Sequence, residues 1–178
     1  MAGALVAGLL GCTAPSGDQL VGRGWLQLDQ ARIELEVTEC ALLAGHLIDR
    51  LPAGGSEVSL VAEGRDQDQR PVRVVARRGT DVVAPHRFHV LEVMIGEVER
   101  DLRVLVLLRG FDRATGRWSQ IDPDAPSARG DVEGPLFAVD GAGLRARTAA
   151  TLEPGGERVT VALVASCPPA AGADPGLA

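Results

Sequence analysis

The chain has 178 residues and a net charge of -6, from 24 acidic and 18 basic residues, and every basic residue is arginine. This length suits one domain with a sizeable core. With no tyrosine, three phenylalanines and two tryptophans, the acidic chain offers neither a strong basic patch for phosphates nor much aromatic surface for stacking bases or sugar rings. The absence of lysine excludes a Walker loop and the Ser-x-x-Lys site of penicillin-recognising enzymes. We therefore expect no nucleic-acid partner.

Residues 2–11 form an apolar run of ten residues that ends at Cys12. The run has the length of a signal-peptide core and is far shorter than the roughly 20 residues that a membrane-spanning helix needs. Its end, Leu9-Leu10-Gly11-Cys12, resembles the lipobox of bacterial lipoproteins. Leu9 and Gly11 occupy the positions that the signal peptidase recognises, and Cys12 occupies the lipidated position. The alternative is a buried N-terminal strand or helix with a packed cysteine.

This resemblance implies a particular maturation of the N-terminus. The Cys12 thiol would take a diacylglyceryl group, residues 1–11 would be removed as a signal peptide, and residues 12–22 would form a lipidated N-terminus and flexible tether. One acyl chain holds a protein only marginally on a membrane, at about 0.8 kcal/mol per buried methylene, whereas two or three hold it stably. The expected location is the outer face of the bacterial cell membrane or envelope, with the membrane as a partner through the N-terminal acyl chains.

From Gln27 onward the sequence shows the alternation of apolar and polar residues that is typical of strands. The stretch 31–37 alternates cleanly, with charged residues on one face and apolar residues on the other. Residues 40–51 are ambiguous, because leucines recur every four residues and favour a short helix. The further predicted strands are 57–64, 71–78, 87–95, 102–109, 134–139, 143–152 and 157–166.

Cys40 and Cys167 remain as a pair if Cys12 of an exported protein is lipidated. Cys167 shares the apolar parity of the strand predicted over 157–166. Cys40 has the parity of the charged face of its strand, so either the strand ends before it or a bulge resets the register. We predict a disulfide between the two, with Cα atoms about 4.4–6.8 Å apart. Two free buried thiols are the alternative.

Eight or nine antiparallel strands joined by hairpin turns predict an all-β fold: an antiparallel β-sandwich closed by one disulfide, with a small β-barrel as the alternative. The expected domain covers residues 23–168, followed by a disordered tail over 169–178. The layout resembles small actinobacterial lipoproteins of the mycobacterial 19 kDa antigen type, with a lipobox, a short tether, an early cysteine, a Gly-rich sandwich and a second cysteine in "VALVASCP". The resemblance implies an envelope antigen without an agreed enzymatic role.

The candidate metal ligands fit structural roles better than binding roles. His86 and His89 are three residues apart, which on a strand places them on opposite faces. Asp66 and Asp68 begin like a calcium loop, but an arginine and a proline follow where another oxygen ligand and a glycine belong, so a hairpin turn is predicted. We expect no metal site and no cofactor.

The segment "DPDAPSARGD" contains Asp122, Asp124 and Asp131, and its proline and glycine spacing predicts an exposed loop. It also contains Arg129-Gly130-Asp131, the tripeptide recognised in integrin ligands, which a chain this rich in arginine, glycine and aspartate contains by chance often enough to make adhesion a poor hypothesis.

Three functions follow from these patterns. The first is a lipid-anchored cell-envelope protein that acts without catalysis, as a binding or scaffold module or a surface antigen with an unknown protein or small-molecule ligand. The second is an envelope hydrolase that uses loop carboxylates such as Asp122, Asp124 and Glu133. The third is an unprocessed cytosolic β domain, in which all three cysteines would be free thiols.

Overall fold

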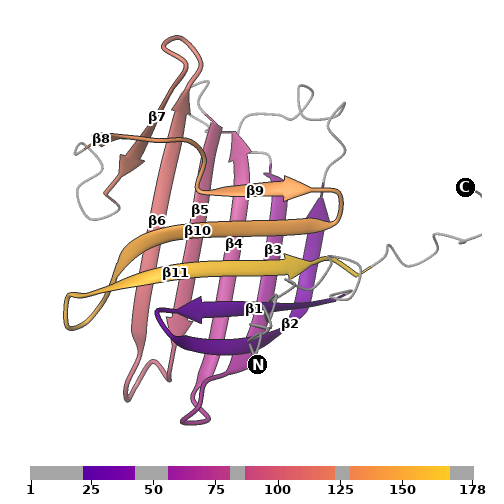
Figure 1. Ribbon diagram of the computed structural model, residues 1–178, viewed down its shortest axis with the longest axis vertical. Coiled ribbons are helices and arrows are strands. Elements are labelled where there is room, and N and C mark those ends of the chain that lie inside the picture. Colours follow the sequence, from indigo (N-terminus) through magenta and orange to yellow (C-terminus); the bar gives the residue numbers. More distant parts are fainter. Residues whose placement is uncertain (1–21, 43–55, 81–86, 123–128, 169–178) are drawn as a thin grey trace, which may run out of the picture.

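The computed structural model describes residues 22–42, 56–80, 87–122 and 129–168 (Figure 1). The described residues form eleven strands and turns. None of their segments is a helix long and apolar enough to cross a membrane. The strands are β1 (Arg23–Leu28), β2 (Ala31–Leu42), β3 (Ser56–Arg65), β4 (Pro71–Thr80), β5 (Arg87–Ile95), β6 (Arg103–Asp112), β7 (Arg117–Ile121), β8 (Arg129–Val132), β9 (Phe137–Asp140), β10 (Gly143–Leu152) and β11 (Glu157–Ser166).

All strands belong to one antiparallel sheet with the order β8-β7-β6-β5-β4-β3-β2-β1-β11-β10-β9. The two edge strands, β8 and β9, are consecutive in the sequence and do not pair with each other. The predicted all-β antiparallel fold is therefore confirmed. The predicted division into the two sheets of a sandwich is not confirmed, because the described strands form one large curled sheet.

The sheet curls because β2 changes its partner along its length. Residues 31–36 of β2 pair with β1, and residues 35–42 pair with β3. In Figure 1, β1, β11, β10 and β9 cross the face of the strands β3 to β6, and β2 bends from one group to the other. A further bridge between Val104 and Glu153 joins β6 to the end of β10. The inner faces of the two crossing groups therefore meet.

The hydrophobic core fills the space between these inner faces. Alternate residues of each strand point inward, as the pleat of a strand requires, and they form one buried cluster. Leu26 and Leu163 from one group and Leu91 from the other are fully buried. The remaining fully buried large side chains are Leu60, Leu105, Leu136, Leu144, Val58, Val72, Val74 and Val93.

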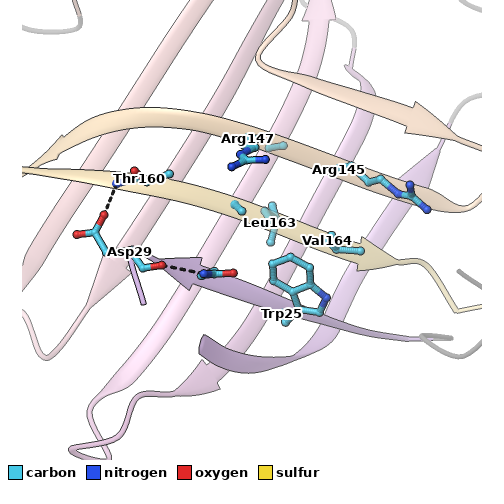
Figure 2. Close-up of a pocket in the computed structure, with 10 residues that line it drawn as sticks. Trp25, Asp29, Arg145, Arg147, Thr160, Leu163 and Val164 are labelled. Carbon is cyan, nitrogen blue, oxygen red and sulfur yellow. Dashed lines mark hydrogen bonds between the residues drawn. The ribbon is translucent and has the colours of Figure 1, made fainter. Parts of the chain in front are cut away.

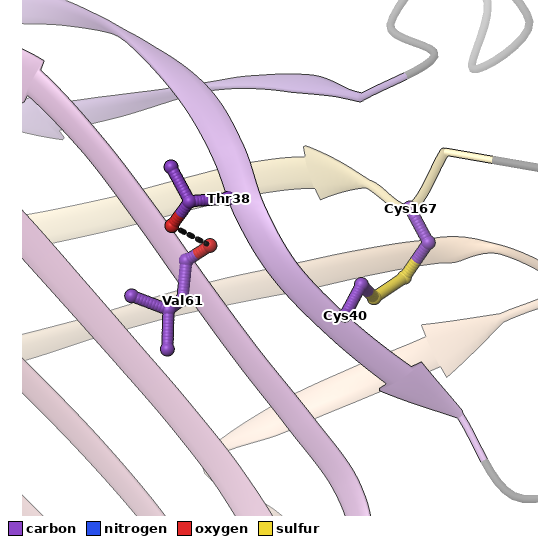
Figure 3. The surroundings of a disulfide bond; sticks show 4 residues. All are labelled: Thr38, Cys40, Val61 and Cys167. Atoms are coloured by element: carbon purple, nitrogen blue, oxygen red, sulfur yellow. Dashed lines mark hydrogen bonds between the residues drawn. A yellow bond between two sulfur atoms is a disulfide. The ribbon is translucent and has the colours of Figure 1, made fainter.

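The disulfide joins Cys40 near the end of β2 to Cys167 just after β11, with a Cα–Cα distance of 5.6 Å (Figure 3). This distance lies inside the predicted range. A register shift between Val37 and Glu39 resets β2, so the bulge and not an early strand end is the correct alternative. The extra residue is Thr38, whose hydroxyl donates a hydrogen bond to the Val61 carbonyl at 3.4 Å. The bulge turns Cys40 toward the core, against which it packs.

The close approach of β2 and β3 at Gly64 predicts a strong effect of a single methyl group. Gly64 pairs with Leu35, and a Cβ at this position would overlap the Glu34 carbonyl oxygen and lie 3.0 Å from Leu35 Cδ2. We expect Gly64→Ala to lower the free energy of unfolding by about 1–3 kcal/mol, because backbone on β2 must move. The matched control is Gly130→Ala on β8, where nothing lies within 4 Å. Equal denaturation midpoints for the two variants would contradict this account.

Candidate functional site

A pocket of about 490 Å³ lies on the outer face of the sheet, over β1, β11 and β10 (Figure 2). Trp25 borders it on β1, and Arg145 and Arg147 border it on β10. Two rows of paired residues cross the pocket. Trp25, Val164 and Arg145 form one row, and Gln27, Ala162 and Arg147 form the next. The residues of β11 in these rows are small, so the surface between the tryptophan and the arginines is hollow.

The pocket carries positive charge on its β10 side. Arg145 and Arg147 are exposed, and among the described residues neither has an ion-pair or hydrogen-bond partner. Because they are two residues apart on one strand, both side chains leave the same face, roughly 6–7 Å apart along the strand. In Figure 2 the two guanidinium groups point in opposite directions along β10, and because both side chains are exposed they can turn toward one anionic group between them.

Trp25 forms the opposite border of the pocket and is half-buried. The guanidinium carbon of Arg32 lies 4.9 Å from its ring centroid, within the range of a cation–π contact. Arg32 is also occupied by Glu34, to which its Nε donates a hydrogen bond at 2.8 Å. The indole Nε1 is buried and has no hydrogen-bond partner in the structure. This donor is therefore unsatisfied, but it is not exposed to a molecule in the pocket.

The end of the pocket at the β1–β2 turn is polar. Asp29 Oδ1 accepts a hydrogen bond from the Thr160 backbone N–H at 2.7 Å, and Gln27 Nε2 donates one to the Asp29 carbonyl at 2.8 Å. These bonds hold Asp29 in place, although its φ of 50° is uncommon for a residue other than glycine. One carboxylate oxygen of Asp29, the Thr160 hydroxyl and the amide oxygen of Gln27 remain for a bound molecule.

A second hollow, of about 550 Å³, lies on the outer face near the β4–β3 and β5–β6 turns. Two arginines line it, but both are occupied. Arg73 forms an ion pair with Glu63 at 3.6 Å, and Arg65 donates to the Gln69 carbonyl at 2.7 Å. Since Arg145 and Arg147 have no such partners among the described residues, the pocket at Trp25 is the stronger candidate for binding an anion.

On the inner face, three arginines surround His89, which is only 3% exposed. Arg78, His89 and Arg109 lie side by side on β4, β5 and β6. Burial, followed by the positive charges of Arg78, Arg109 and Arg87, lowers the pKa of His89 to about 3. The ring contacts aromatic rings of β7 and β9. His89 is thus a neutral member of the core.

Arg109 in this cluster has a structural role. Its Nη1 donates to the carbonyls of Glu133, Gly134 and Pro135, at 3.4, 3.2 and 3.1 Å, and its Nη2 to the Thr148 hydroxyl at 3.4 Å. Burial lowers the pKa of Arg109. The side chain therefore fastens the connection between the two edge strands, β8 and β9, to β6.

The structure brings together few of the residues singled out in the sequence. Leu9, Gly11 and Cys12 of the lipobox-like motif lie outside the described residues, as do His86 and Asp124. No group of three or more histidine, cysteine, aspartate or glutamate side chains among the described residues is arranged to hold a metal ion.

The acidic residues near the calcium-like motif form a hairpin turn, as predicted. Asp66 Oδ1 accepts hydrogen bonds from the backbone N–H groups of Asp68 and Arg70, and its Oδ2 accepts one from Arg70 Nε at 2.7 Å. Burial raises the pKa of Asp66, but the bonds and charge of Arg70 outweigh it and lower the pKa overall. The carboxylate is therefore used by its own turn.

The expected exposed loop over 122–131 is partly wrong, because its last residues form strand β8. Asp131 lies on this strand and forms an ion pair with Arg117 at 3.1 Å. Asp122 and Glu133 follow opposite ends of the β7–β8 pair, in which Ile121 is opposite Arg129. These two carboxylates of the hydrolase hypothesis are not brought together.

Comparison of the chain with protein-family models, with curated proteins and with solved structures finds no match. The candidate site is therefore assigned from its geometry alone.

Proposed function

We propose that this protein is a lipid-anchored binding protein of the cell envelope. In this proposal Cys12 carries the acyl chains, and the curled sheet presents the pocket at Trp25 to a ligand. The protein is a binding module and not a catalyst, because the pocket offers cations, an indole and hydrogen-bonding groups but no activated nucleophile.

The observation that carries the proposal is the use of the three cysteines. Cys40 and Cys167 are joined to each other, which leaves Cys12 as the third cysteine of the chain. That cysteine stands in the Leu9-Leu10-Gly11-Cys12 motif. A structural disulfide is also typical of proteins that fold outside the cytosol. Ten residues of sequence separate Cys12 from Arg23, where the first strand begins, and this length suits a tether.

Replacement of Cys12 with serine tests the anchor. In a bacterial host that processes lipoproteins, we expect Cys12→Ser to give an uncleaved or unanchored product, because serine has no thiol for diacylglyceryl transfer. The measurement is the intact mass of detergent-extracted protein together with its release by carbonate washing. The control is Thr13→Ala, which keeps the thiol and should behave like the unaltered chain. If Cys12→Ser had the same cleavage state and the same membrane partition as the unaltered chain, this would contradict the proposal and favour an unprocessed domain.

A further inference from the structure

We propose that the pocket at Trp25 binds an acidic saccharide, with the carboxylate of one sugar ring on Arg145 and Arg147. This inference rests on the proposed function, since it names the ligand of the binding module. It is carried by the arrangement of three chemical groups around one hollow: unpaired cations, an indole and a set of hydroxyl-binding atoms.

The charges favour an anion at the β10 side of the pocket. Arg145 and Arg147 are exposed and have no ion-pair partner among the described residues. Two acidic side chains near the pocket each accept a hydrogen bond. Glu34 accepts from Arg32, and Asp29 accepts from the Thr160 backbone. The net charge of -6 argues against a long polyanion, so a short acidic saccharide that places one carboxylate opposite the two arginines fits best.

The remaining lining atoms favour a hydroxyl-rich ring over an apolar one. The free carboxylate oxygen of Asp29 and the amide oxygen of Gln27 can accept hydrogen bonds from sugar hydroxyls, and the Thr160 hydroxyl can do both. Trp25 supplies an apolar surface for the C–H groups of a ring.

The width of the pocket matches a single ring. Trp25 on β1 and Arg145 on β10 are separated by one strand, β11, so their backbones are about 10 Å apart at two strand spacings. Ala162 and Val164 on β11 form the floor between them. The volume of about 490 Å³ lies within the range of small-molecule sites.

The test is titration of the full chain with trigalacturonic acid, followed by calorimetry and by tryptophan fluorescence. Because the chain has two tryptophans, Trp118→Phe leaves Trp25 as the sole reporter, and Trp25→Phe removes it. We expect binding at one site with a fluorescence change that disappears in Trp25→Phe. The double variant R145A/R147A should bind roughly tenfold or more weakly, since each charge-assisted hydrogen bond accounts for up to about tenfold in affinity.

The matched control is Arg158→Ala, which removes the same charge from the outer face of β11 but does not line the pocket. It should change the affinity less than about twofold. The trimethyl ester of the same saccharide keeps the rings without the charge and should bind as weakly to the unaltered chain as the acid binds to R145A/R147A.

Several results would overturn the inference. They are an equal affinity for the acid and its ester, an affinity of R145A/R147A for the acid that equals that of the unaltered chain, or binding that does not saturate below about 10 mM. Equal binding of inorganic sulfate would reduce the site to one for bare anions. Tighter binding of anionic phospholipid vesicles, lost in R145A/R147A, would assign the arginines to lipid head groups. Saccharide titration of the Cys12→Ser protein measures the pocket without the proposed anchor. The anchoring proposal and the saccharide proposal can therefore fail independently.

Discussion

Removing the bridge between Cys40 and Cys167 should lower the free energy of unfolding by about 2–5 kcal/mol. The bridge spans 127 residues, and restricting a loop of that length in the unfolded chain corresponds to about 5 kcal/mol in the entropy treatment of cross-links. Both half-cystines pack at the edge of the core, and Cys167 is 8% exposed. Their thiols or alanine replacements can remain in place, so the fold itself should persist.

The loss of local protection should be confined to the residues next to the bridge. Strand β11 is paired on both sides, with β1 and with β10, so most of its amides stay bonded without the disulfide. The Cys167 amide donates to the Ala142 carbonyl at 2.8 Å, outside these ladders. We expect faster hydrogen exchange at Cys167 and at the end of β2 first.

Chemical denaturation of the oxidised protein, the reduced protein and the double variant C40A/C167A measures this effect. The last two should unfold at the same lower denaturant concentration, because both lack the cross-link. Membrane partition should be unchanged in both, since it depends on Cys12 in the proposed function. Equal midpoints for the oxidised and reduced proteins would show that the bridge does not stabilise the fold.

The strands that could be predicted from the sequence are those with one buried face. Residues 143–152 and 157–166 alternate over much of their length, and the structure has β10 and β11 with these same bounds. In both strands buried apolar residues such as Leu144 and Leu163 occupy alternate positions, so the period of two indicates the buried face. Cys40 has the parity of the charged face of its strand, and the bulge between Val37 and Glu39 turns it inward.

Strands without a one-sided burial pattern were missed. In β7 the residues 118–121 are all half-buried, so no alternation marks the strand. In β8 the segment Arg129–Val132 is a short sheet edge that contains a glycine and follows prolines and aspartates. β1 begins at Arg23, ahead of the predicted start at Gln27, because Gly22 and Gly24 interrupt its pattern. The continuity of the sheet depends on β2 changing partners, which no local pattern expresses.

The pocket at Trp25 could not be predicted, because its parts come from strands far apart in the sequence. Arg145 and Arg147 on alternate positions of β10 indicate only an exposed strand face. Their position opposite Trp25 depends on β11 pairing with both β1 and β10. The composition correctly indicated few aromatic residues, but a single indole next to two arginines is a local arrangement that composition does not report.

The inner cluster shows the same dependence on register. The sequence singles out His89 only as a candidate metal ligand, whereas in the structure it is 3% exposed and lies between aromatic rings. The centroid of the His89 ring lies 4.8 Å from that of the Trp118 ring and 4.4 Å from that of the Phe137 ring. The three neighbouring arginines and this burial hold the ring neutral, with a pKa of about 3.

Acid should therefore destabilise the protein through His89. The pKa of His89 is lower in the folded chain, at about 3, than its usual 6.5, so the unfolded chain binds the proton more tightly. The stabilisation is complete above pH 6.5 and is lost as the pH falls toward 3. Between pH 7 and 4.5 we expect the free energy of unfolding to fall by about 2–3 kcal/mol from this residue.

The variant His89→Phe isolates this contribution, since it keeps a ring between Trp118 and Phe137 but cannot titrate. Denaturation at pH 7 and at pH 4.5 should show a smaller loss of stability in His89→Phe than in the unaltered protein. The loss of stability on protonation of the Asp66 carboxylate, whose pKa is also lowered, is the same in both proteins and cancels in the comparison. The imidazole resonances give a direct second measurement, because His89 should stay neutral at pH 4.5 while the protein is folded. Parallel pH profiles, or a His89 titration centred near 6.5, would show that the ring is not buried among the arginines as described.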